Sequence, residues 1–211
     1  MQYEVKRICI GQVEKKTFNG KEKETAYYKY PIEMPTLLTS TGFVGDNQVY
    51  KGHGGVNKAV CLYDFNDYAL WKDYMVLDTL YTLMGENITT VGLDKDKICI
   101  GDTFKLGEAV IQVSEGRGPC NTIAQVHNVP HIVKMMCTSR ATGCYFRVLV
   151  EGMVAPNSQL DLIVKDNNGL TLHEYNELMY GDKYNTRLLE KPLKVDVLSG
   201  DVKEKFKKRI K

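Results

Sequence analysis

Residues 100–114 read IGDTFKLGEAVIQVS, and their pattern indicates the fold class. Two turn signals, Ile100-Gly101-Asp102 and Leu106-Gly107-Glu108, lie on either side of a short segment, and an apolar run at residues 109–114 follows them. Glycine and aspartate favour turns, whereas closely spaced Val and Ile favour strands. The stretch therefore predicts short strands that are joined by tight turns.

The same pattern extends over residues 3–164. Runs rich in Val, Ile and Tyr occupy residues 3–10, 24–30, 59–63, 109–114, 143–151 and 160–164. Many short strands with glycine-rich turns indicate a mainly β protein, either a barrel or a sandwich. One helix is predicted at residues 64–75, where Phe65, Tyr68, Trp71 and Met75 follow helical spacing, and we expect this aromatic stripe to pack in the core.

After residue 164 the pattern changes from strand to helix. A polar linker at residues 165–169 precedes Thr171 and Glu174, which form the pattern of a capping box. Apolar residues then follow helical spacing at Leu172, Tyr175, Leu178 and Met179, and again at Leu198, Val202, Phe206 and Ile210. Residues 184–190 are a weaker candidate for a third short helix.

We therefore predict a β domain at residues 1–165 and a small helical extension at residues 170–211. The extension is too small for a large core of its own, so we expect it to pack on the barrel or on a partner. Its basic end, residues 203–211, is interpreted as a solvated helix face rather than an anion-binding tail.

Composition narrows the class of protein. The chain has 211 residues, and its 28 Lys and Arg nearly balance its 26 Asp and Glu, which gives no electrostatic case for nucleic acid as the main partner. No apolar run approaches the roughly 20 residues of a membrane helix, and no apolar segment follows the first charges. The six cysteines form no C-x-x-C pair, so we expect a reduced, cytoplasmic protein.

Two glycine-containing motifs carry polar side chains. Residues 51–58 read KGHGGVNK and follow Gly45-Asp46; Gly54 and Gly55 permit close approach of a ligand, His53 adds a titratable group and Lys58 adds a cation. The motif predicts a phosphate cradle or, equally well, a tight turn without a ligand. Residues 85–90 read GENITT, in which Asn87 and Thr89 hold either the loop backbone or a polar ligand.

Residues 114–122, SEGRGPCNT, contain the cysteine that differs from the other five. Pro119 suits the first position of a helix, which would place Cys120 in the first turn, where the helix dipole and Arg117 both lower a thiol pKa. Cys120 is thus either a reactive or metal-binding thiolate or an ordinary loop cysteine. In residues 143–148, Arg147 either lines a ligand cleft or faces water.

In order along the chain, the motifs H-G-G-x-x-K, G-E-N-x-T, I-G-D, R-x-P-C and G-x-Y-x-R-V resemble the MOSC domain. This domain occurs at the C-terminus of molybdenum cofactor sulfurases and as stand-alone bacterial proteins with a three-helix extension, which residues 170–211 resemble. The resemblance implies a β-barrel of the pyruvate-kinase-barrel-like type, with a few helices and a small helical appendage.

The resemblance also implies a function. Cys120 falls on the signature cysteine, which ligates molybdenum or accepts a persulfide sulfur in relatives, and the expected cofactor is the molybdenum cofactor, Mo-molybdopterin. The residues that match its pterin and phosphate are His53, Gly54, Gly55, Lys58, Asn87, Thr89, Arg117 and Arg147. Related proteins reduce N-hydroxylated compounds, including hydroxylamino-purine-like ones, with electrons from a separate flavin or iron–sulfur reductase.

Three residues depart from many stand-alone relatives: Asn57 replaces Asp, Thr122 replaces Lys and Cys144 replaces Trp. The lost positive charge at Thr122 predicts weaker phosphate binding or a higher Cys120 pKa. The alternatives are therefore an N-hydroxy-compound reductase, a carrier of the cofactor or of sulfur as a Cys120 persulfide, and a barrel that has lost ligand binding. Pyridoxal phosphate is an association of the sulfurases alone, through a separate domain.

Overall fold

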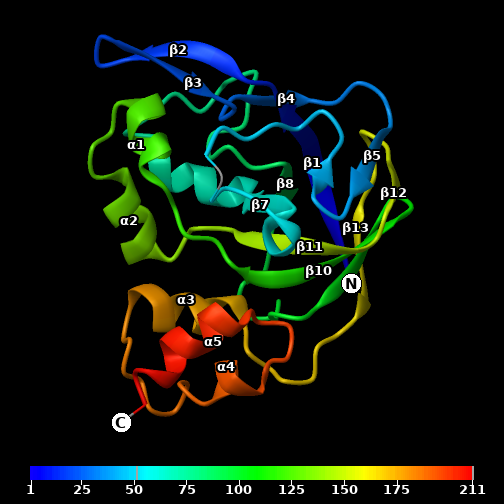
Figure 1. The fold of residues 1–211 in the computed structure, drawn as a ribbon, viewed down its shortest axis with the longest axis vertical. Coiled ribbons are helices and arrows are strands. Elements are labelled where there is room, and N and C mark those ends of the chain that lie inside the picture. The colour runs from blue at the N-terminus through cyan, green and yellow to red at the C-terminus, as the bar shows by residue number, and fades with distance from the viewer. Residues whose placement is uncertain (51, 211) are drawn as a thin grey trace.

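Seven strands close into a barrel in the computed structural model, which describes residues 1–50 and 52–210 (Figure 1). Around the barrel the order is β13-β9-β10-β11-β7-β8-β1, and β1 pairs with β13 to close it. These strands are β1 (Gln2–Gly11), β7 (Val60–Asp64), β8 (Ile88–Val91), β9 (Thr103–Leu106), β10 (Ala109–Gly116), β11 (Cys144–Val150) and β13 (Leu160–Val164). The predicted mainly β barrel is therefore confirmed.

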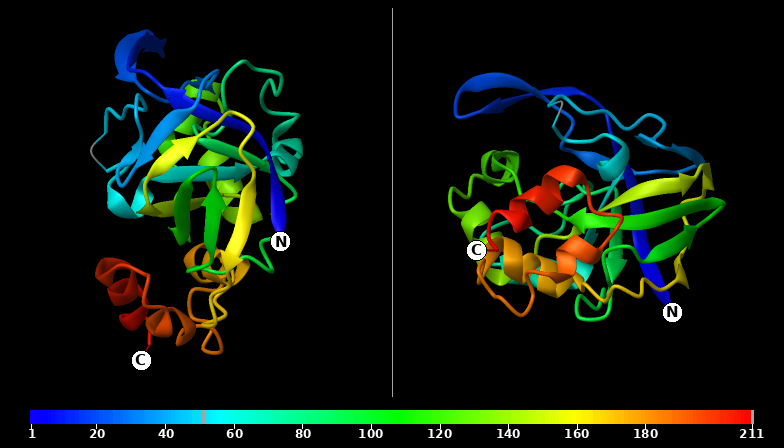
Figure 2. Two further views of the ribbon diagram at one scale, coloured as in Figure 1. Left: turned by 90° about the vertical axis from the view of Figure 1, so that its right-hand side faces the viewer. Right: turned by 60° about the horizontal axis from the view of Figure 1, so that its bottom comes forward.

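Smaller elements surround the barrel. The strands are β2 (Glu14–Phe18) and β3 (Lys21–Thr25), which form a hairpin, β4 (Lys29–Pro31), which pairs with β1, and β5 (Thr36–Thr39), β6 (Gly42–Phe43) and β12 (Gly152–Val154), which form a small sheet. The helices are η1 (Val56–Lys58), η2 (Phe65–Trp71), α1 (Asn121–His127), α2 (Ile132–Ser139), α3 (Leu172–Tyr180), α4 (Lys191–Lys194) and α5 (Gly200–Lys207). The β2–β3 hairpin projects from one end of the molecule, and α3, α4 and α5 gather at the other (Figures 1 and 2).

Strand β10 shows how the sequence builds the core. Ala109, Ile111 and Val113 alternate along the strand and are fully buried, as expected where one face of a strand faces the barrel interior. The pairing with β11 shifts register between Val113 and Glu115. Such a bulge re-aims the chain at a strand end. The shift lies directly before Arg117, so it brings the R-x-P-C segment to the rim of the barrel.

The predicted helix at residues 64–75 is a shorter 3₁₀ helix, η2. Tyr68, Trp71 and Met75 are buried, so the aromatic stripe packs in the core as predicted. Tyr63 from β7 stacks on Tyr68, with ring centroids 5.6 Å apart, and accepts a 2.8 Å hydrogen bond from Trp71. We attribute the tighter helix to these fixed side chains, because tertiary contacts override local propensity.

Other predicted boundaries also differ. The run at residues 24–30 divides into the end of β3 and the start of β4, and Tyr27 turns inward between them. Residues 184–190 form turns, and the short helix α4 begins at Lys191 instead, because Pro192 fits only the first turn of a helix. The predicted capping box is present, since Thr171 accepts from the Glu174 amide and Glu174 accepts from the Thr171 amide, each at 3.1 Å.

The helical extension packs on the barrel. Leu172, Tyr175, Leu178 and Phe206 are fully buried in the same apolar cluster as barrel residues such as Phe104. The backbone of Leu170 and Leu172 pairs with that of Ile100 and Ile98, at 2.9 and 2.8 Å. The division into a unit at residues 1–165 and an extension at residues 170–211 stays a prediction about folding.

Lys51, which begins the motif at residues 51–58, and Lys211, which ends the basic segment at residues 203–211, lie outside the described residues. Within residues 1–50 and 52–210, none of the helices combines the length and the apolar character that are needed to cross a bilayer.

Candidate functional site

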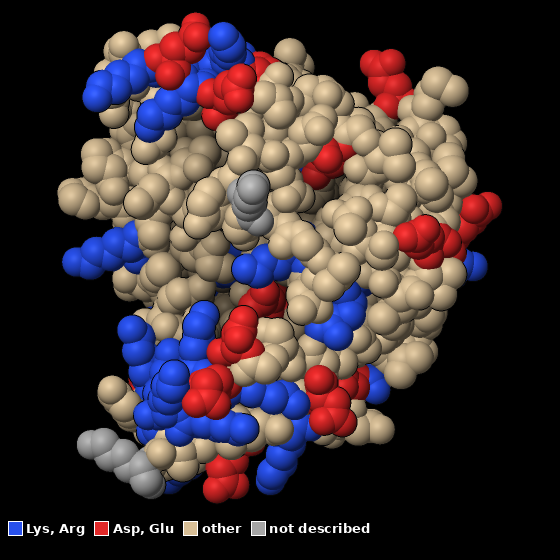
Figure 3. Space-filling model, viewed as in Figure 1, with Lys and Arg blue, Asp and Glu red and all other residues tan. Residues whose placement is uncertain are grey.

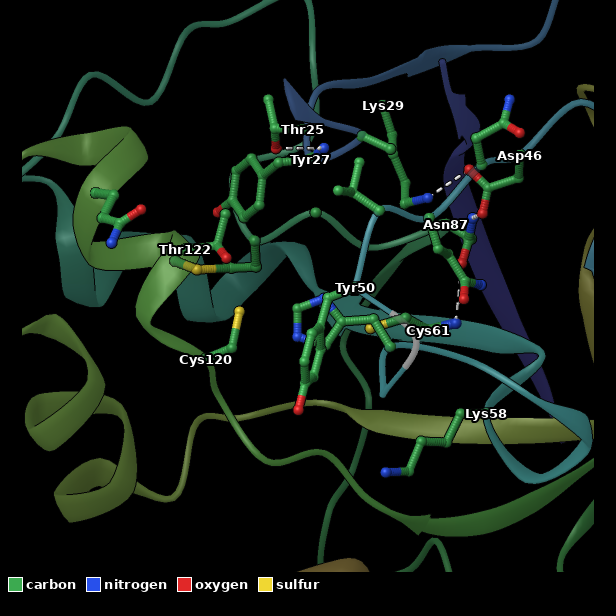
Figure 4. A pocket seen from close by; sticks show the side chains of 18 of the residues that line it. Thr25, Tyr27, Lys29, Asp46, Tyr50, Lys58, Cys61, Asn87, Cys120 and Thr122 are labelled. Atoms are coloured by element: carbon green, nitrogen blue, oxygen red, sulfur yellow. Dashed lines mark hydrogen bonds and ion pairs between the residues drawn. The ribbon is translucent and has the colours of Figure 1, made fainter. Parts of the chain in front are cut away.

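A cleft of about 230 Å³ opens beside the barrel where the predicted motifs meet. The β2–β3 hairpin, the loop before η1, strand β7, the loop before β8 and the start of α1 all contribute to its walls (Figure 4). The lining residues that carry the argument are Tyr27, Lys29, Asp46, Tyr50, His53, Lys58, Cys61, Asn87, Arg117, Cys120, Thr122 and Tyr145. The sequence predicts nine site residues. Five of them line this cleft, namely His53, Lys58, Asn87, Arg117 and Cys120.

Cys120 lies in the turn between β10 and α1, and its sulfur points into the cleft between Tyr27 and Tyr50 (Figure 4). Its backbone is extended, with φ −113°, and it is the N-cap of α1 rather than a residue of the first turn. The predicted helix start at Pro119 is therefore wrong by two residues. The physical reason is that Pro119 and Cys120 are still part of the extended segment that leaves the barrel.

The environment of Cys120 favours the thiolate. Burial by itself raises the thiol pKa, but a hydrogen bond from His53, the charge of Arg117 and a hydrogen bond from Thr122 together bring the pKa down to about 6. A thiol with this pKa is about nine-tenths ionised at pH 7. Thr122 thus supports the thiolate by a hydrogen bond, whereas the effect of Thr relative to Lys at this position stays a prediction.

The other five cysteines differ from Cys120 in the direction of their pKa shifts. Burial raises the pKa of Cys9 to about 12 and that of Cys61 to about 11. Burial also raises the pKa of Cys99, Cys137 and Cys144. Cys120 is therefore the one cysteine whose surroundings stabilise a negative charge, as the sequence predicts.

Arg117 is a buried cation with free hydrogen-bond donors. Its side chain is 5% exposed, and one terminal NH₂ group donates to the carbonyl oxygen of Met84. The Nε and Nη1 atoms find no partner among residues 1–50 and 52–210. Unpaired buried donors are costly, and a guanidinium fork matches phosphate and carboxylate geometry. A buried guanidinium with two donor atoms unpaired among the described residues therefore lies in the same cleft as the Cys120 sulfur.

The His53–Lys58 loop supplies two side chains to the cleft. The His53 ring packs edge-on against Tyr50, with centroids 5.0 Å apart. Lys58 Nζ lies 3.7 Å from Glu115 Oε1, and its ammonium group is 5.6 Å from the centre of the Tyr145 ring. The loop therefore presents one imidazole and one partly neutralised cation to a ligand.

The two glycines of this loop do not line the cleft. Gly54 has φ +154°, and a side chain there would overlap the amide of Gln48. Gly55 has φ +92° and is the N-cap of η1. The backbone conformation at both positions, and the limited space at Gly54, explain why glycine stands there. This agrees with the alternative of a tight turn without a ligand.

Asn87 organises the cleft wall from within. Its Oδ1 accepts a 3.1 Å hydrogen bond from the Cys61 amide, and its Nδ2 donates to Asp46 Oδ2 at 2.8 Å (Figure 4). Asp46 also forms a buried ion pair with Lys29 and accepts from the Gly11 amide at 2.7 Å. This amide–carboxylate–ammonium chain fixes the wall on the side away from Cys120.

Two predicted ligands lie elsewhere. Thr89 is fully buried and donates to Glu86 Oε1 at 3.0 Å, away from the residues that line the cleft. Arg147 donates to the carbonyl oxygen of Val197 beneath the helical extension. The position of Arg147 on β11 explains why it does not line the cleft. Tyr145 of the same strand faces the cleft, whereas Arg147 lies two residues farther along the strand.

Sequence reasoning missed Lys29, Tyr27 and Cys61 as cleft residues. Lys29 and Tyr27 stand in a run that reads as one strand, and Cys61 stands in an apolar run typical of a buried strand. Only the break between β3 and β4 turns Tyr27 and Lys29 toward the cleft. Asp46 had a signal, because it follows Gly45 directly ahead of the glycine-rich motif.

The described residues contain no group of three or more His, Cys, Asp or Glu side chains that is arranged to hold a metal ion. Cys61 also lines the cleft, but burial raises its pKa to about 11. Among residues 1–50 and 52–210, Cys120 is therefore the cleft cysteine that offers a thiolate, a soft metal donor, near neutral pH.

A barrel with a cysteine thiolate and a buried arginine at its rim agrees with what comparison with known proteins shows. Residues 49–161, more than half of the chain, match the MOSC domain. The chain belongs to the MOSC domain family. It is 34% identical over 209 residues to the uncharacterized protein YflK of Bacillus subtilis, and the match covers 99% of this chain and 95% of YflK.

Two further relatives and a solved structure extend the comparison. The protein YiiM of Escherichia coli is 32% identical over 145 residues, which are 67% of this chain and 65% of YiiM. A Gibberella moniliformis protein named "Reductase" is 31% identical over 161 residues, which are 74% of this chain but 28% of that longer protein. The crystal structure of YiiM from Geobacillus stearothermophilus superposes with a TM-score of 0.79 at 28% identity and covers 99% of this chain and 100% of that one.

Proposed function

We propose that this protein binds the molybdenum cofactor in the cleft and reduces N-hydroxylated compounds, with Cys120 as the protein ligand of the metal. One observation carries the proposal: a thiol with a pKa of about 6 shares a cleft with a buried arginine, two donor atoms of which have no partner in the described part of the chain. A soft thiolate suits a soft metal, and a buried guanidinium suits a phosphate.

The residues present fit such a cofactor. Arg117 Nε and Nη1 would hold an anionic group, and Lys58 adds a second positive charge on the same cleft. The rings of Tyr27 and Tyr50 offer flat apolar walls to a pterin or an aromatic substrate. Membership of the MOSC domain family and a relative that is named "Reductase" both support the proposal.

When bound, the cofactor would supply a two-electron redox centre with a position open to substrate. The net reaction is R–NHOH + 2 e⁻ + 2 H⁺ → R–NH₂ + H₂O, in which the N–O bond breaks, an N–H bond forms and the oxygen leaves as water. The electrons come from a separate flavin or iron–sulfur reductase.

The side chains of the chain itself have defined tasks in this proposal. Arg117 and the hydrogen bonds from His53 and Thr122 hold the negative charge of Cys120, so the thiolate is available at neutral pH. The Lys29–Asp46–Asn87 chain keeps the opposite wall in place. Phe18 of the β2–β3 hairpin and Met84 add apolar side chains to the lining of the cleft.

The test is metal analysis combined with an assay on protein made in a host that synthesises the cofactor. We expect about one molybdenum per chain and reduction of a hydroxylamino-purine with reduced methyl viologen as donor. Stoichiometric molybdenum without turnover would support a cofactor carrier instead. A Cys120 peptide heavier by one sulfur atom, without molybdenum, would support a sulfur carrier. Absence of both metal and added sulfur would contradict every binding function at this cleft.

A further inference from the structure

Positive charge gathers on α5 and the turn after it (Figure 3). In the sequence, residues 1–169 carry 18 Lys and Arg against 19 Asp and Glu, whereas residues 170–211 carry 10 against 7. The basic residues concerned are Lys203, Lys205, Lys207, Lys208 and Arg209, which we call the α5 surface. The excess positive charge of this protein is therefore local, and it belongs to the extension.

The amphipathic pattern of α5 explains why this charge faces outward. Val202 and Phe206 are buried in the apolar cluster that the extension shares with the barrel, and Ser199 caps the helix by accepting from the Val202 amide. Lys205, Lys207 and Lys208 are exposed on the remaining faces. The charged surface is thus fixed rigidly to the core through the helix that carries it.

The α5 surface adjoins the cleft. Burial raises the pKa of Glu115, and the nearby charges of Lys58 and Lys205 oppose this effect. Glu115 lies 3.7 Å from the cleft lysine Lys58, and Lys205 of α5 is near enough for its charge to act on the same carboxylate. The extension contacts the site directly through Tyr180, whose hydroxyl donates to the Arg117 carbonyl oxygen at 3.1 Å.

The proposed reaction takes two electrons for each N–O bond, so a reduced carrier must deliver them at the cleft. Carrier proteins bind briefly, and charge complementarity brings them to the correct face and raises the association rate. A basic surface beside the cleft complements an acidic carrier. The carboxylates of Asp196, Asp201 and Glu204 lie among these basic residues in the sequence. A surface with both signs of charge favours a protein partner, whereas a nucleic acid would favour a continuous row of cations.

We propose that the α5 surface docks an acidic electron-carrier protein, such as a flavodoxin, and thereby places its redox centre beside the cleft. This inference rests on the proposed function and adds the partner and the face that receives it. The extension then has two roles: its apolar side stabilises the barrel, and its basic side recruits the donor.

Carbodiimide cross-linking tests the docking without any turnover. The reagent joins carboxylates to lysines in contact, so cofactor-free protein is mixed with an acidic bacterial flavodoxin at low ionic strength and the cross-linked peptides are mapped. We expect cross-links at Lys205 and Lys208. The double variant Lys205→Glu/Lys208→Glu should lose them, whereas the control Lys21→Glu/Lys105→Glu, with the same charge change on exposed residues outside the α5 surface, should keep them.

Kinetics separates this inference from the proposed function. For the α5 double variant we expect an apparent KM for reduced flavodoxin about tenfold above wild type at low salt, and a smaller difference at high salt. Turnover with methyl viologen should equal wild type in both double variants, because that small donor needs no docking surface.

Several results would overturn the docking. These are cross-links that map to other lysines, an equal KM in the α5 variant and its control, or turnover with methyl viologen but with no acidic carrier. Binding to vesicles of anionic lipid that depends on Lys205 and Lys208, without cross-links to flavodoxin, would assign the surface to membranes instead. A metal-loaded wild type that is inactive with methyl viologen would contradict the proposed reductase function itself.

Discussion

The hydroxyl of Tyr180 donates a 3.1 Å hydrogen bond to the carbonyl oxygen of Arg117. Tyr180 ends α3 in the helical extension, and Arg117 carries the guanidinium donors that have no partner within the described part of the chain. The Arg117 amide is also held, by the carbonyl oxygen of Gly143 at 3.0 Å. The backbone that positions the Arg117 guanidinium is thus fixed by the barrel on one side and by the extension on the other.

We expect Cys120→Ser to lose molybdenum and turnover while the protein remains folded. The hydroxyl is a harder and far less acidic donor than the thiol, so the soft metal bond is lost. Serine is a favourable residue at an N-cap, which is the position of Cys120, so stability should not fall. Metal content and thermal unfolding are the measurements, with Cys137→Ser as the control. A Cys120→Ser variant that retains full molybdenum content would refute the ligand assignment.

Alkylation should report the thiolate directly. In cofactor-free protein, the iodoacetamide rate at Cys120 should rise as the pH passes through about 6 and then level off, because the thiolate forms above the pKa. Cys137, whose pKa burial raises, should react slowly until alkaline pH. Replacing His53 with Ala removes a hydrogen bond to the thiolate, so the midpoint should move to higher pH. Peptide mapping that finds Cys137 modified first at pH 7 would contradict this.

Arg117→Met should stabilise the cofactor-free protein at pH 5 and abolish anion binding. At that pH Cys120 is protonated, so the change removes a buried cation with two unpaired donors, and the free energy of unfolding should rise by about 1–3 kcal/mol. Denaturant unfolding measures this effect. The matched change Arg140→Met breaks an ion pair with Glu177 at 2.7 Å and should not stabilise. Equal destabilisation by both changes would show that Arg117 has a mainly structural role.

Removal of residues 170–211 should lower the thermal stability and solubility of the remaining barrel, because the tail fills part of the shared apolar cluster. A milder test is Phe206→Ala, which deletes a fully buried ring whose centroid lies 5.9 Å from that of Tyr175. This change should lower the free energy of unfolding by about 3–5 kcal/mol. Ile210→Ala, at a 41% exposed position, should change stability by less than about 0.5 kcal/mol. A truncated chain as stable as the full chain would show that the extension is an independent unit.

Local patterns predict the parts of this fold in which neighbouring residues decide the structure. The apolar run at residues 109–114 predicts β10, and the capping box predicts the start of α3. The same patterns miss α2 and the division between β3 and β4, because long-range packing ends those elements. Tyr27, for example, leaves its strand and its hydroxyl reaches the Leu83 carbonyl, 56 residues away.

The candidate site follows the same rule. Cys120 and Arg117 are predicted because both stand in one short segment, and their mutual effect on the thiol pKa needs only that proximity. Lys29 and Cys61 enter the cleft through the three-dimensional arrangement of strands, which no spacing in the sequence encodes. Arg147 shows the opposite error, since a motif position that matches the family faces the extension rather than the cleft.

Closure of the barrel has a consequence for biogenesis. Tyr3 of β1 pairs with Leu160 of β13, so this edge of β1 stays unpaired until β13 has been synthesised. Hairpins such as β9–β10 close quickly, but joining β1 to β13 requires the ends of a long chain segment to meet, which is slow. During translation, the nascent barrel exposes the edges of β1 and its apolar face. We therefore expect the nascent chain to depend on chaperones until β13 has emerged.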